Sequence, residues 1–239
     1  MPFPRVKGQA YEYSNHMPLA VMWRKGINNP GREVYDFISF IDFAPTLFDI
    51  AAVNYQESGM HKMEGKSFSD IFRSRNKGFI DKNRDHVLIG KERHDVGRPD
   101  DIGYPIRGII KDGFLYIRNY KPERWPAGNP ETGYLNTDGS PTKSLILNLR
   151  REGISSEYWE LSFGKRDDDE LYNITSDPEC LINLSNNPGY NAIKRKLNDQ
   201  LIDELIIQDD PRITGNGDLF DQYPYADSRT KDFYNRFMK

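Results

Sequence analysis

The sequence predicts an α/β fold that divides near residue 85, and three patterns carry this prediction. In residues 1–85, a short apolar run is followed by an amphipathic helical pattern, as in the strand–helix units of an α/β sheet. In residues 86–239, apolar segments on both sides of a turn dipeptide indicate a small antiparallel sheet. A helical pattern over residues 190–207 can cover one face of that sheet.

The composition indicates a globular chain and excludes two classes of partner. The chain has 239 residues, of which 29% are charged and 13% aromatic, and its mean hydropathy is −0.76. Aromatic content at this level requires a buried core. The net charge is −3, so no long-range positive field would gather nucleic acid or an anionic membrane. We therefore expect neither as a partner.

Cysteine and histidine usage argues against a metal site in this chain. Cys180 is the single cysteine, which excludes an intrachain disulfide and a cysteine-rich zinc site. The four histidines are scattered, without the spacing of paired metal ligands. No run approaches the roughly 20 apolar residues of a membrane helix, and residues 1–8 lack a secretory-signal pattern.

The first part contains one predicted strand and one predicted helix. The strand is the apolar run at residues 18–23, with both faces buried in a sheet. The helix covers residues 43–52, with Asp42 as its N-cap and Pro45 in its first turn. Residues 54–85 are predicted as a surface connection with one short helix near residues 67–73.

The second part contains three predicted strands, at residues 86–90, 106–110 and 114–118. Asp112 and Gly113, between the last two, are a strong hairpin signal. Residues 120–143 hold four prolines and are predicted as a long loop. The helix at residues 190–207 has apolar residues, Leu197, Leu201 and Leu205 among them, at helical spacing.

Three segments of the first part resemble the type I sulfatase family, in the order in which that family has them. Residues 5–12 resemble its Lys-Gly-x-x-Tyr-(Asp/Glu) segment, residues 39–47 its Ser-x-x-Asp-x-x-Pro-Thr-Leu helix, and residues 65–68 its Gly-x-Ser-Leu turn. The resemblance implies that Lys7 binds a sulfate oxygen. An ammonium beside a glycine suits that role, because it can approach a tetrahedral anion closely. A solvated surface lysine is the alternative.

The second part is similar to the heparan N-sulfatase (sulfamidase) branch of that family. Residues 90–94, 104–107 and 119–126 look like its His-containing loop, its Tyr-Pro-x-Arg strand and its Trp-Pro loop. Residues 170–184 resemble the Glu-Leu-Tyr-Asp-Leu-x-x-Asp-Pro-x-Glu-x-x-Asn-Leu signature of sulfatase C-termini, with Asn173 where Asp is usual.

The resemblance implies a fold and a set of site residues. The fold is an incomplete alkaline phosphatase-like sulfatase fold: residues 1–85 are the last strand–helix portion of the α/β domain with its connection, and residues 86–239 a C-terminal antiparallel α+β subdomain. The implied catalytic residue is Lys7, and the implied substrate-binding residues are Glu92, His94, Arg107 and Arg124. A surface-loop histidine at position 94 and a structural ion pair between Arg107 and Glu92 are the alternatives.

The catalytic half of the family pattern is not found in this sequence. It lacks the Cys/Ser-x-Pro-x-Arg segment whose first residue becomes formylglycine, and it lacks the Asp and Asn ligands of calcium. The implied function is that of the C-terminal portion of a sulfatase that hydrolyses sulfate ester or sulfamate groups on glycosaminoglycan-type sugars. Calcium would be bound in the complete family enzyme by residues absent here, and we expect the isolated chain to be inactive.

The expected partners are a sulfated sugar and either a missing N-terminal catalytic half or another copy of the chain. A non-catalytic carbohydrate-binding or regulatory remnant of a truncated sulfatase gene is the alternative function. The parent family is usually periplasmic, extracellular or lysosomal. The residues present do not separate N-sulfate from O-sulfate specificity.

Overall fold

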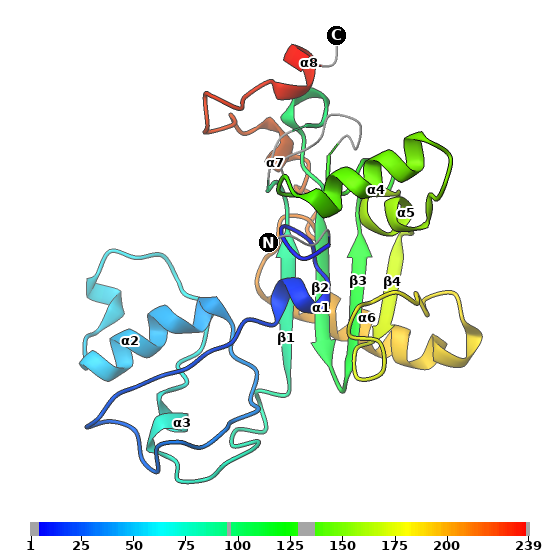
Figure 1. The fold of residues 1–239 in the computed structure, drawn as a ribbon. Coiled ribbons are helices and arrows are strands. Elements are labelled where there is room, and N and C mark those ends of the chain that lie inside the picture. The colour runs from blue at the N-terminus through cyan, green and yellow to red at the C-terminus, as the bar shows by residue number, and fades with distance from the viewer. Residues whose placement is uncertain (1–4, 95–96, 129–136, 238–239) are drawn as a thin grey trace. The chain divides into compact units, whose positions relative to one another are not determined.

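The structure is a computed structural model and describes residues 5–94, 97–128 and 137–237 (Figure 1). The chain divides into two compact units. Residues 18–88 form the small unit, and residues 1–17 together with 89–239 form the large unit. The division into domains at residue 85 stays a prediction.

The small unit consists of short helical elements joined by irregular segments. Its elements are η1 Phe40–Asp42, α2 Phe43–Ala51, η2 Tyr55–Glu57 and α3 Ser69–Arg73. The large unit holds the sheet and the longer helices. Its strands are β1 His86–Lys91, which crosses the division, β2 Ile106–Lys111, β3 Phe114–Asn119 and β4 Asp169–Asn173. Its helical elements are α1 Glu12–Asn15, η3 Pro99–Asp101, α4 Pro141–Arg151, α5 Glu157–Phe163, η5 Pro188–Tyr190, α6 Asn191–Ile207, α7 Leu219–Gln222 and α8 Phe233–Phe237. Within the described ranges, no helix has the length and apolar character that a membrane crossing requires.

The sheet has the strand order β1-β2-β3-β4. Strand β3 pairs antiparallel with both β2 and β4. Asp112 and Gly113 close the β2–β3 hairpin with φ angles of 52° and 75°, the left-handed backbone that a tight two-residue hairpin turn requires. The predicted hairpin and the predicted small antiparallel sheet are confirmed.

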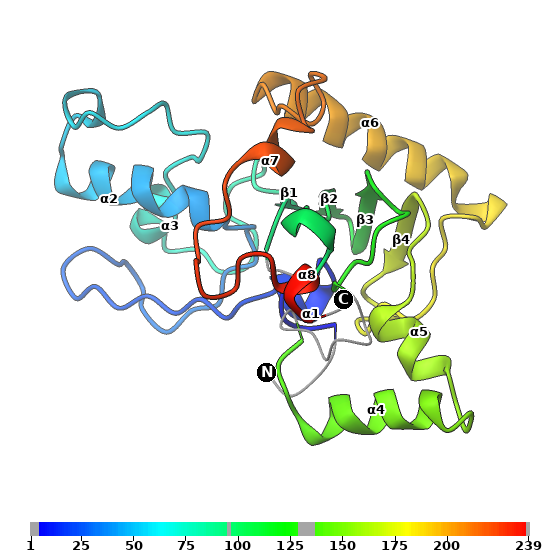
Figure 2. The ribbon, with the colours of Figure 1, turned by 90° about the horizontal axis from the view of Figure 1, so that it is seen from above.

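Helix α6 covers one face of the sheet, as predicted. Leu197, Leu201 and Leu205 are buried on it, and it contacts β2 and β3. The hydroxyl of Tyr116 on β3 lies 3.1 Å from Oδ1 of Asn198 on α6, so Tyr116 faces this helix. Figure 2 shows α6 along this face of the sheet, with α1 and α5 on the other side.

Helices α4 and α5 pack against each other through an aromatic-rich cluster. The indole of Trp159 meets Phe163 one turn later and Trp125 from the preceding loop. The buried members of the cluster are Ala127, Ile146, Leu147, Trp159 and Phe163. This cluster orders the chain on both sides of the segment 129–136.

The start of α4 corrects one prediction. The hydroxyl of Ser140 accepts the N–H of Lys143 at 3.1 Å, and Pro141 occupies the first helical position. A serine cap followed by proline is a strong helix start, so the prediction of a loop through residue 143 was wrong at its end. Residues 129–136 of that predicted loop lie outside the described residues.

In the small unit, Asp42 organises two segments rather than capping α2. Its carboxylate accepts the N–H of Ser39 at 3.0 Å and that of Lys66 at 2.8 Å, and it pairs with Arg84 at 2.9 Å. Its side chain makes no capping bond to α2. Asp42 does occupy the predicted N-cap position, but its carboxylate does not cap α2, because the 3₁₀ turn η1 precedes that helix and takes up the carboxylate.

The helix and the glycine turn that resemble sulfatase segments meet in this unit. The hydroxyl of Thr46 donates to the carbonyl of Asp42 at 2.6 Å and accepts the N–H of Phe68 at 3.0 Å. Asp49 accepts hydrogen bonds from Ser67, at 2.8 Å, and from Ser69. These bonds fasten residues 65–69 along α2.

The apolar run at residues 18–23 is not a strand, contrary to the prediction. It is irregular, and Leu19 and Val21 are about half exposed while Met22 is 96% exposed. None of the described residues of the small unit pairs with it as a neighbouring strand. An apolar run becomes a strand only when a partner satisfies its backbone.

Candidate functional site

Lys7 lies on a surface loop whose N-terminal flank is tied to the large unit. The guanidinium of Arg5 donates to the carbonyl of Leu161 at 2.6 Å and to that of Cys180 at 2.5 Å. It also stacks 3.8 Å above the centre of the Tyr11 ring. Cys180 itself is 1% exposed. The backbone just before Lys7 is therefore anchored to the large unit.

The C-terminal flank of the loop is held by Lys91, the last residue of β1. Its Nζ donates to the carbonyl of Gly8 at 2.7 Å and lies 5.7 Å from the centre of the Tyr104 ring. Burial, together with the nearby Arg98 and Arg166, lowers the pKa of Lys91 to about 7. The backbone is thus fixed on both sides of Lys7.

Behind the loop, a buried carboxylate anchors α1 to the sheet. Glu170 on β4 is 4% exposed. It accepts hydrogen bonds from the hydroxyls of Tyr11 at 3.0 Å and Tyr172 at 2.6 Å, and from the amide of Asn119 at 2.8 Å. Burial, with a contribution from Glu170, raises the pKa of both tyrosines above the usual range. These hydroxyls therefore stay protonated and act as donors.

The side chain of Lys7 itself is accessible. Its Nζ pairs with Oδ1 of Asp138 at 2.7 Å, and the two side chains are 43% and 39% exposed. The hydrogen bond from Lys7 lowers the pKa of Asp138. An exposed pair of this kind is weak in water, so an anionic ligand can take the place of the carboxylate.

Glu92 and Arg107 are brought together, in a buried ion network. Arg107 forks onto Asp210 through Nε at 2.8 Å and Nη2 at 3.1 Å, and Nη2 also lies 2.7 Å from Glu92. The other oxygen of Glu92 binds Arg212 at 2.6 Å. Burial opposes the charge on Arg107, but Asp210 and Glu92 outweigh it and raise its pKa. All donors of this network face carboxylates or carbonyls of the protein.

Arg124 is held in a separate closed arrangement. Its guanidinium binds Asp221 at 2.8 Å and the carbonyl of Gly103 at 2.9 Å. The other oxygen of Asp221 accepts the N–H of Gly103 at 2.8 Å. Arg124 therefore joins the segment before β2 to α7.

His94 is exposed on the loop that follows β1. The preceding Arg93 anchors this loop, because it donates to the carbonyl of Tyr223 at 2.9 Å and to that of Asp101 at 3.3 Å. His94 thus stands at the surface just beyond two residues, Glu92 and Arg93, that are held in place.

Lys7 and the Glu92–Arg107 pair belong to opposite faces of the sheet. On β4, Asp169 contacts the hydroxyl of Tyr116 on the α6 face, whereas its neighbour Glu170 contacts Tyr11 on the other. Successive strand residues point to opposite faces. Arg107 shares the α6 face, because it reaches Asp210 just beyond that helix. Lys7 makes no hydrogen bond or ion pair with the other four predicted site residues among those described.

Sequence reasoning missed the acidic partners of the predicted site residues. Asp138, Asp210 and Asp221 each lie about a hundred residues from the cation they bind. No local pattern marks such a partner, so only Glu92, which the sequence paired with Arg107, was found.

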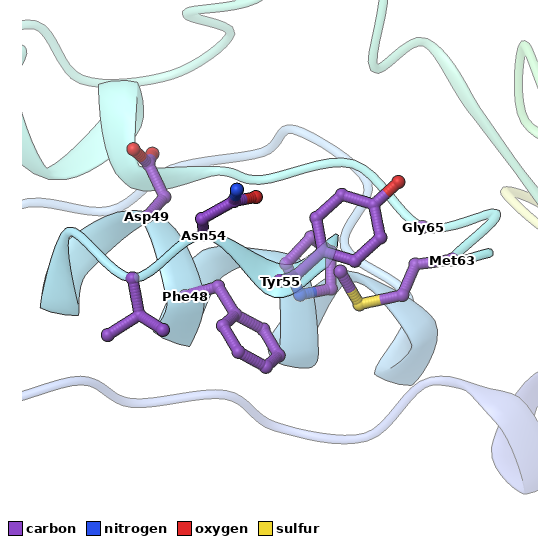
Figure 3. A pocket seen from close by; sticks show the side chains of 8 residues that line it. Phe48, Asp49, Asn54, Tyr55, Met63 and Gly65 are labelled. Carbon is purple, nitrogen blue, oxygen red and sulfur yellow. The ribbon is translucent and has the colours of Figure 1, made fainter. Parts of the chain in front are cut away.

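The small unit has a pocket of its own, of about 260 Å³. Figure 3 shows Phe48 and Asp49 from α2, Asn54 and Tyr55 from the following turn, and Met63. None of the predicted site residues lines it.

Within the part of the chain that the structure describes, no three His, Cys, Asp or Glu side chains are grouped so that they could hold a metal ion.

Comparison with protein families gives a match in the first part of the chain. Residues 6–98 match the family model described as N-sulphoglucosamine sulphohydrolase, C-terminal. Over 195 residues the chain is 31% identical to the "Ulvan-active sulfatase" of Formosa agariphila, a match that covers 79% of this chain and 28% of that protein. The chain thus spans little more than a quarter of the length of this curated relative.

Comparison with solved structures gives partial likenesses. One is a protein in complex with its substrate D-glucosamine-2-N,6-O-disulfate, at 17% identity and a TM-score of 0.43, covering 72% of this chain and 25% of that one. Another is a 2-O glycosaminoglycan sulfatase, at 17% identity and a TM-score of 0.41, covering 80% and 28%.

Proposed function

Because this chain is a member of the sulfatase family and corresponds to its C-terminal region, we propose that it serves in removing sulfate groups from sulfated sugars, with Lys7 contacting the sulfate. The observation that carries this proposal is the placement of Lys7. Its ammonium is exposed, while the backbone on either side is fixed by Arg5 and Lys91. An accessible cation on a fixed loop can meet an anion in one reproducible position.

The chemistry of Lys7 suits the cleavage of a sulfate group. Negative charge develops on the leaving atom and on the sulfate oxygens as the bond to sulfur breaks, and an ammonium in contact with them stabilises that charge. Asp138 holds the ammonium in the absence of substrate. Exchange of this carboxylate for a sulfate keeps the charge of Lys7 paired throughout.

We assign His94 to the rim that meets the sugar, and the ion pairs of Glu92, Arg107 and Arg124 to holding that rim. Arg107 and Arg124 are each bound to a carboxylate in a partly or fully buried setting. A guanidinium held in this way is a poor donor to a ligand, because the ligand would have to displace the carboxylate and leave it unpaired. The imidazole of His94 is exposed at the surface, where a sugar can reach it.

The finer proposal is a heparan N-sulfatase-like activity on a glycosaminoglycan-type sugar. It is supported by the description of the matching family model. The similarity to an ulvan-active sulfatase supports a sulfated polysaccharide more generally. Release of sulfate from N-sulfated glucosamine, compared with release from 6-O-sulfated glucosamine, tests which description applies.

The roles of Lys7 and His94 are tested in the native polypeptide that contains this sequence, on whichever of these sugars it turns over. Lys7→Ala is expected to reduce kcat about a hundredfold, since a contact made mainly in the transition state is lost. His94→Ala should raise KM and leave kcat nearly unchanged, because it removes uniform binding. Lys77→Ala, an exposed lysine of the small unit, is the matched control.

Near-normal kcat in Lys7→Ala would contradict the assignment of Lys7. An equal loss of kcat in both variants would contradict the division of roles between Lys7 and His94. If the native polypeptide binds sulfated sugars with no turnover at all, the carbohydrate-binding alternative holds instead.

A further inference from the structure

A polar groove of about 710 Å³ lies on the α6 face of the sheet, where β3 ends and β4 begins. Side chains from the first half of α6 form its other wall. Because Lys7 approaches the opposite face, the groove is separate from the loop that carries it. None of the five residues predicted from the sequence lines it.

Three cations line the groove. Arg118 lies at the end of β3, with its guanidinium 5.3 Å from the centre of the Tyr120 ring. Lys194 on α6 lies 3.6 Å from Oδ2 of Asp169. Arg195 is exposed and has no hydrogen bond or ion pair with any described residue. A cation without a carboxylate partner favours an anionic ligand.

Hydrogen-bond acceptors stand beside these cations. Asp168, the residue before β4, is exposed and lines the groove. Asp169 already interacts with the hydroxyl of Tyr116, at 2.7 Å, and with Lys194. A simple anion would be repelled by these carboxylates, whereas a ligand that also carries hydroxyl donors can bind them.

Tyr120 contributes its aromatic ring, and not its hydroxyl, to the groove. Its side chain lines the groove, yet its hydroxyl oxygen is buried and has no hydrogen-bond partner among the described residues. The Tyr120 ring, already beside a guanidinium, also gives the groove an aromatic wall against which a sugar ring can pack.

We propose that this groove binds one anionic sugar unit of a polysaccharide. Arg118, Lys194 and Arg195 surround its sulfate or carboxylate, Asp168 accepts from its hydroxyls, and the Tyr120 ring packs against the sugar ring. The choice of a saccharide rests on the proposed function. The groove would hold a polysaccharide at a point on the face opposite to Lys7, and so keep the chain attached between successive encounters with the reacting loop.

Calorimetric titration of the chain at low ionic strength tests the groove. The probes are N,6-O-disulfated glucosamine, glucuronic acid, unsulfated glucosamine and inorganic sulfate. The two anionic sugars distinguish sulfate from carboxylate as the recognised group. The variants are Arg195→Glu and its neighbour Lys196→Glu, which changes the net charge equally but does not line the groove.

We expect Arg195→Glu to weaken binding of an anionic sugar at least about tenfold, as for loss of a charge-assisted contact, and Lys196→Glu to weaken it less than twofold. Inorganic sulfate and unsulfated glucosamine should both bind much more weakly than the anionic sugar. Sulfate lacks the sugar hydroxyls, and unsulfated glucosamine lacks the anionic group.

Equal losses in Arg195→Glu and Lys196→Glu would overturn the proposal, since they would reflect only the overall field. Equal binding of inorganic sulfate and the sugar would overturn it as well. Lys7→Ala separates the two proposals: it should leave binding in the groove intact. If Lys7→Ala abolished sugar binding while Arg195→Glu left it unchanged, the groove proposal would be refuted and the Lys7 site supported.

Discussion

The backbone at Gly65 lies so close to Ile41 that a Cβ on Gly65 would stand 2.0 Å from the Ile41 carbonyl oxygen. Glycine is therefore required there by space. Gly65→Ala is expected to destabilise the small unit by about 1–3 kcal/mol, as overpacking typically does. Urea unfolding measures the change. Gly139→Ala, where no heavy atom lies within 4 Å of the added Cβ, is the control, and a similar effect in both variants would contradict the prediction.

Lys91 should make the stability of the large unit depend on pH. Its pKa is lowered to about 7 in the folded chain from an ordinary value of 10.5. The unfolded chain therefore binds more protons between these values, so the contribution of Lys91 to stability rises with pH across this window, by at most about 1.4 kcal/mol per pH unit. Below pH 7 its destabilising effect is constant.

Lys91→Met removes this dependence, and urea unfolding followed by tryptophan fluorescence at several pH values from 6 to 10 reveals it. We expect the stability of the wild type relative to Lys91→Met to increase with pH above 7. The exposed lysine variant Lys82→Met serves as the reference. A wild-type-to-variant difference that stays flat from pH 7 to 10 would show that Lys91 is not desolvated.

Arg107 should be important for stability, because it is buried on an inner strand of the sheet. Arg107→Ala leaves Glu92 and Asp210 facing each other in a setting where the three side chains are 9–18% exposed. Removal of one member of such a group costs about 3–5 kcal/mol. Arg107→Lys keeps the charge but not the fork and should cost less. Urea unfolding compares the two, and a loss below 1 kcal/mol in Arg107→Ala would argue for a free, ligand-binding arginine.

Asp138 is expected to compete with sulfate for Lys7. Asp138→Asn removes the competing charge and should therefore strengthen binding of inorganic sulfate at Lys7. Asp100→Asn, an exposed acid of the large unit, gives the same change in net charge away from Lys7. Sulfate titrations monitored through the Lys7 ammonium resonance separate them. Equal sulfate affinities in the two variants would mean that Asp138 does not compete with sulfate for Lys7.

The sequence predicted what local patterns specify. The Asp112-Gly113 turn fixes the β2–β3 hairpin because both residues adopt left-handed backbone cheaply. The spacing of Leu197, Leu201 and Leu205 fixes the buried side of α6. These signals are complete within a few residues, and the structure contains both elements.

Apart from the start of α4, whose Ser140 cap and Pro141 are a local signal, the failures involve partners that are distant in the chain. Residues 18–23 are apolar enough for a strand, but no described neighbour pairs with them. Asp42 has the chemistry of an N-cap, yet Lys66 and Arg84 claim its carboxylate. Likewise, nothing near Arg107 in the sequence announces Asp210, 103 residues away. Tertiary partners override local preference in each case.

The buried Cys180 is an intrinsic chemical probe of local opening. Burial raises the pKa of its thiol to about 12, and only the thiolate reacts with alkylating reagents. Modification in the folded state must therefore wait for an opening that exposes residues near Pro178, where Arg5 also docks. Since this is the single thiol of the chain, the rate of alkylation reports how often the surroundings of Cys180 open, with no introduced label.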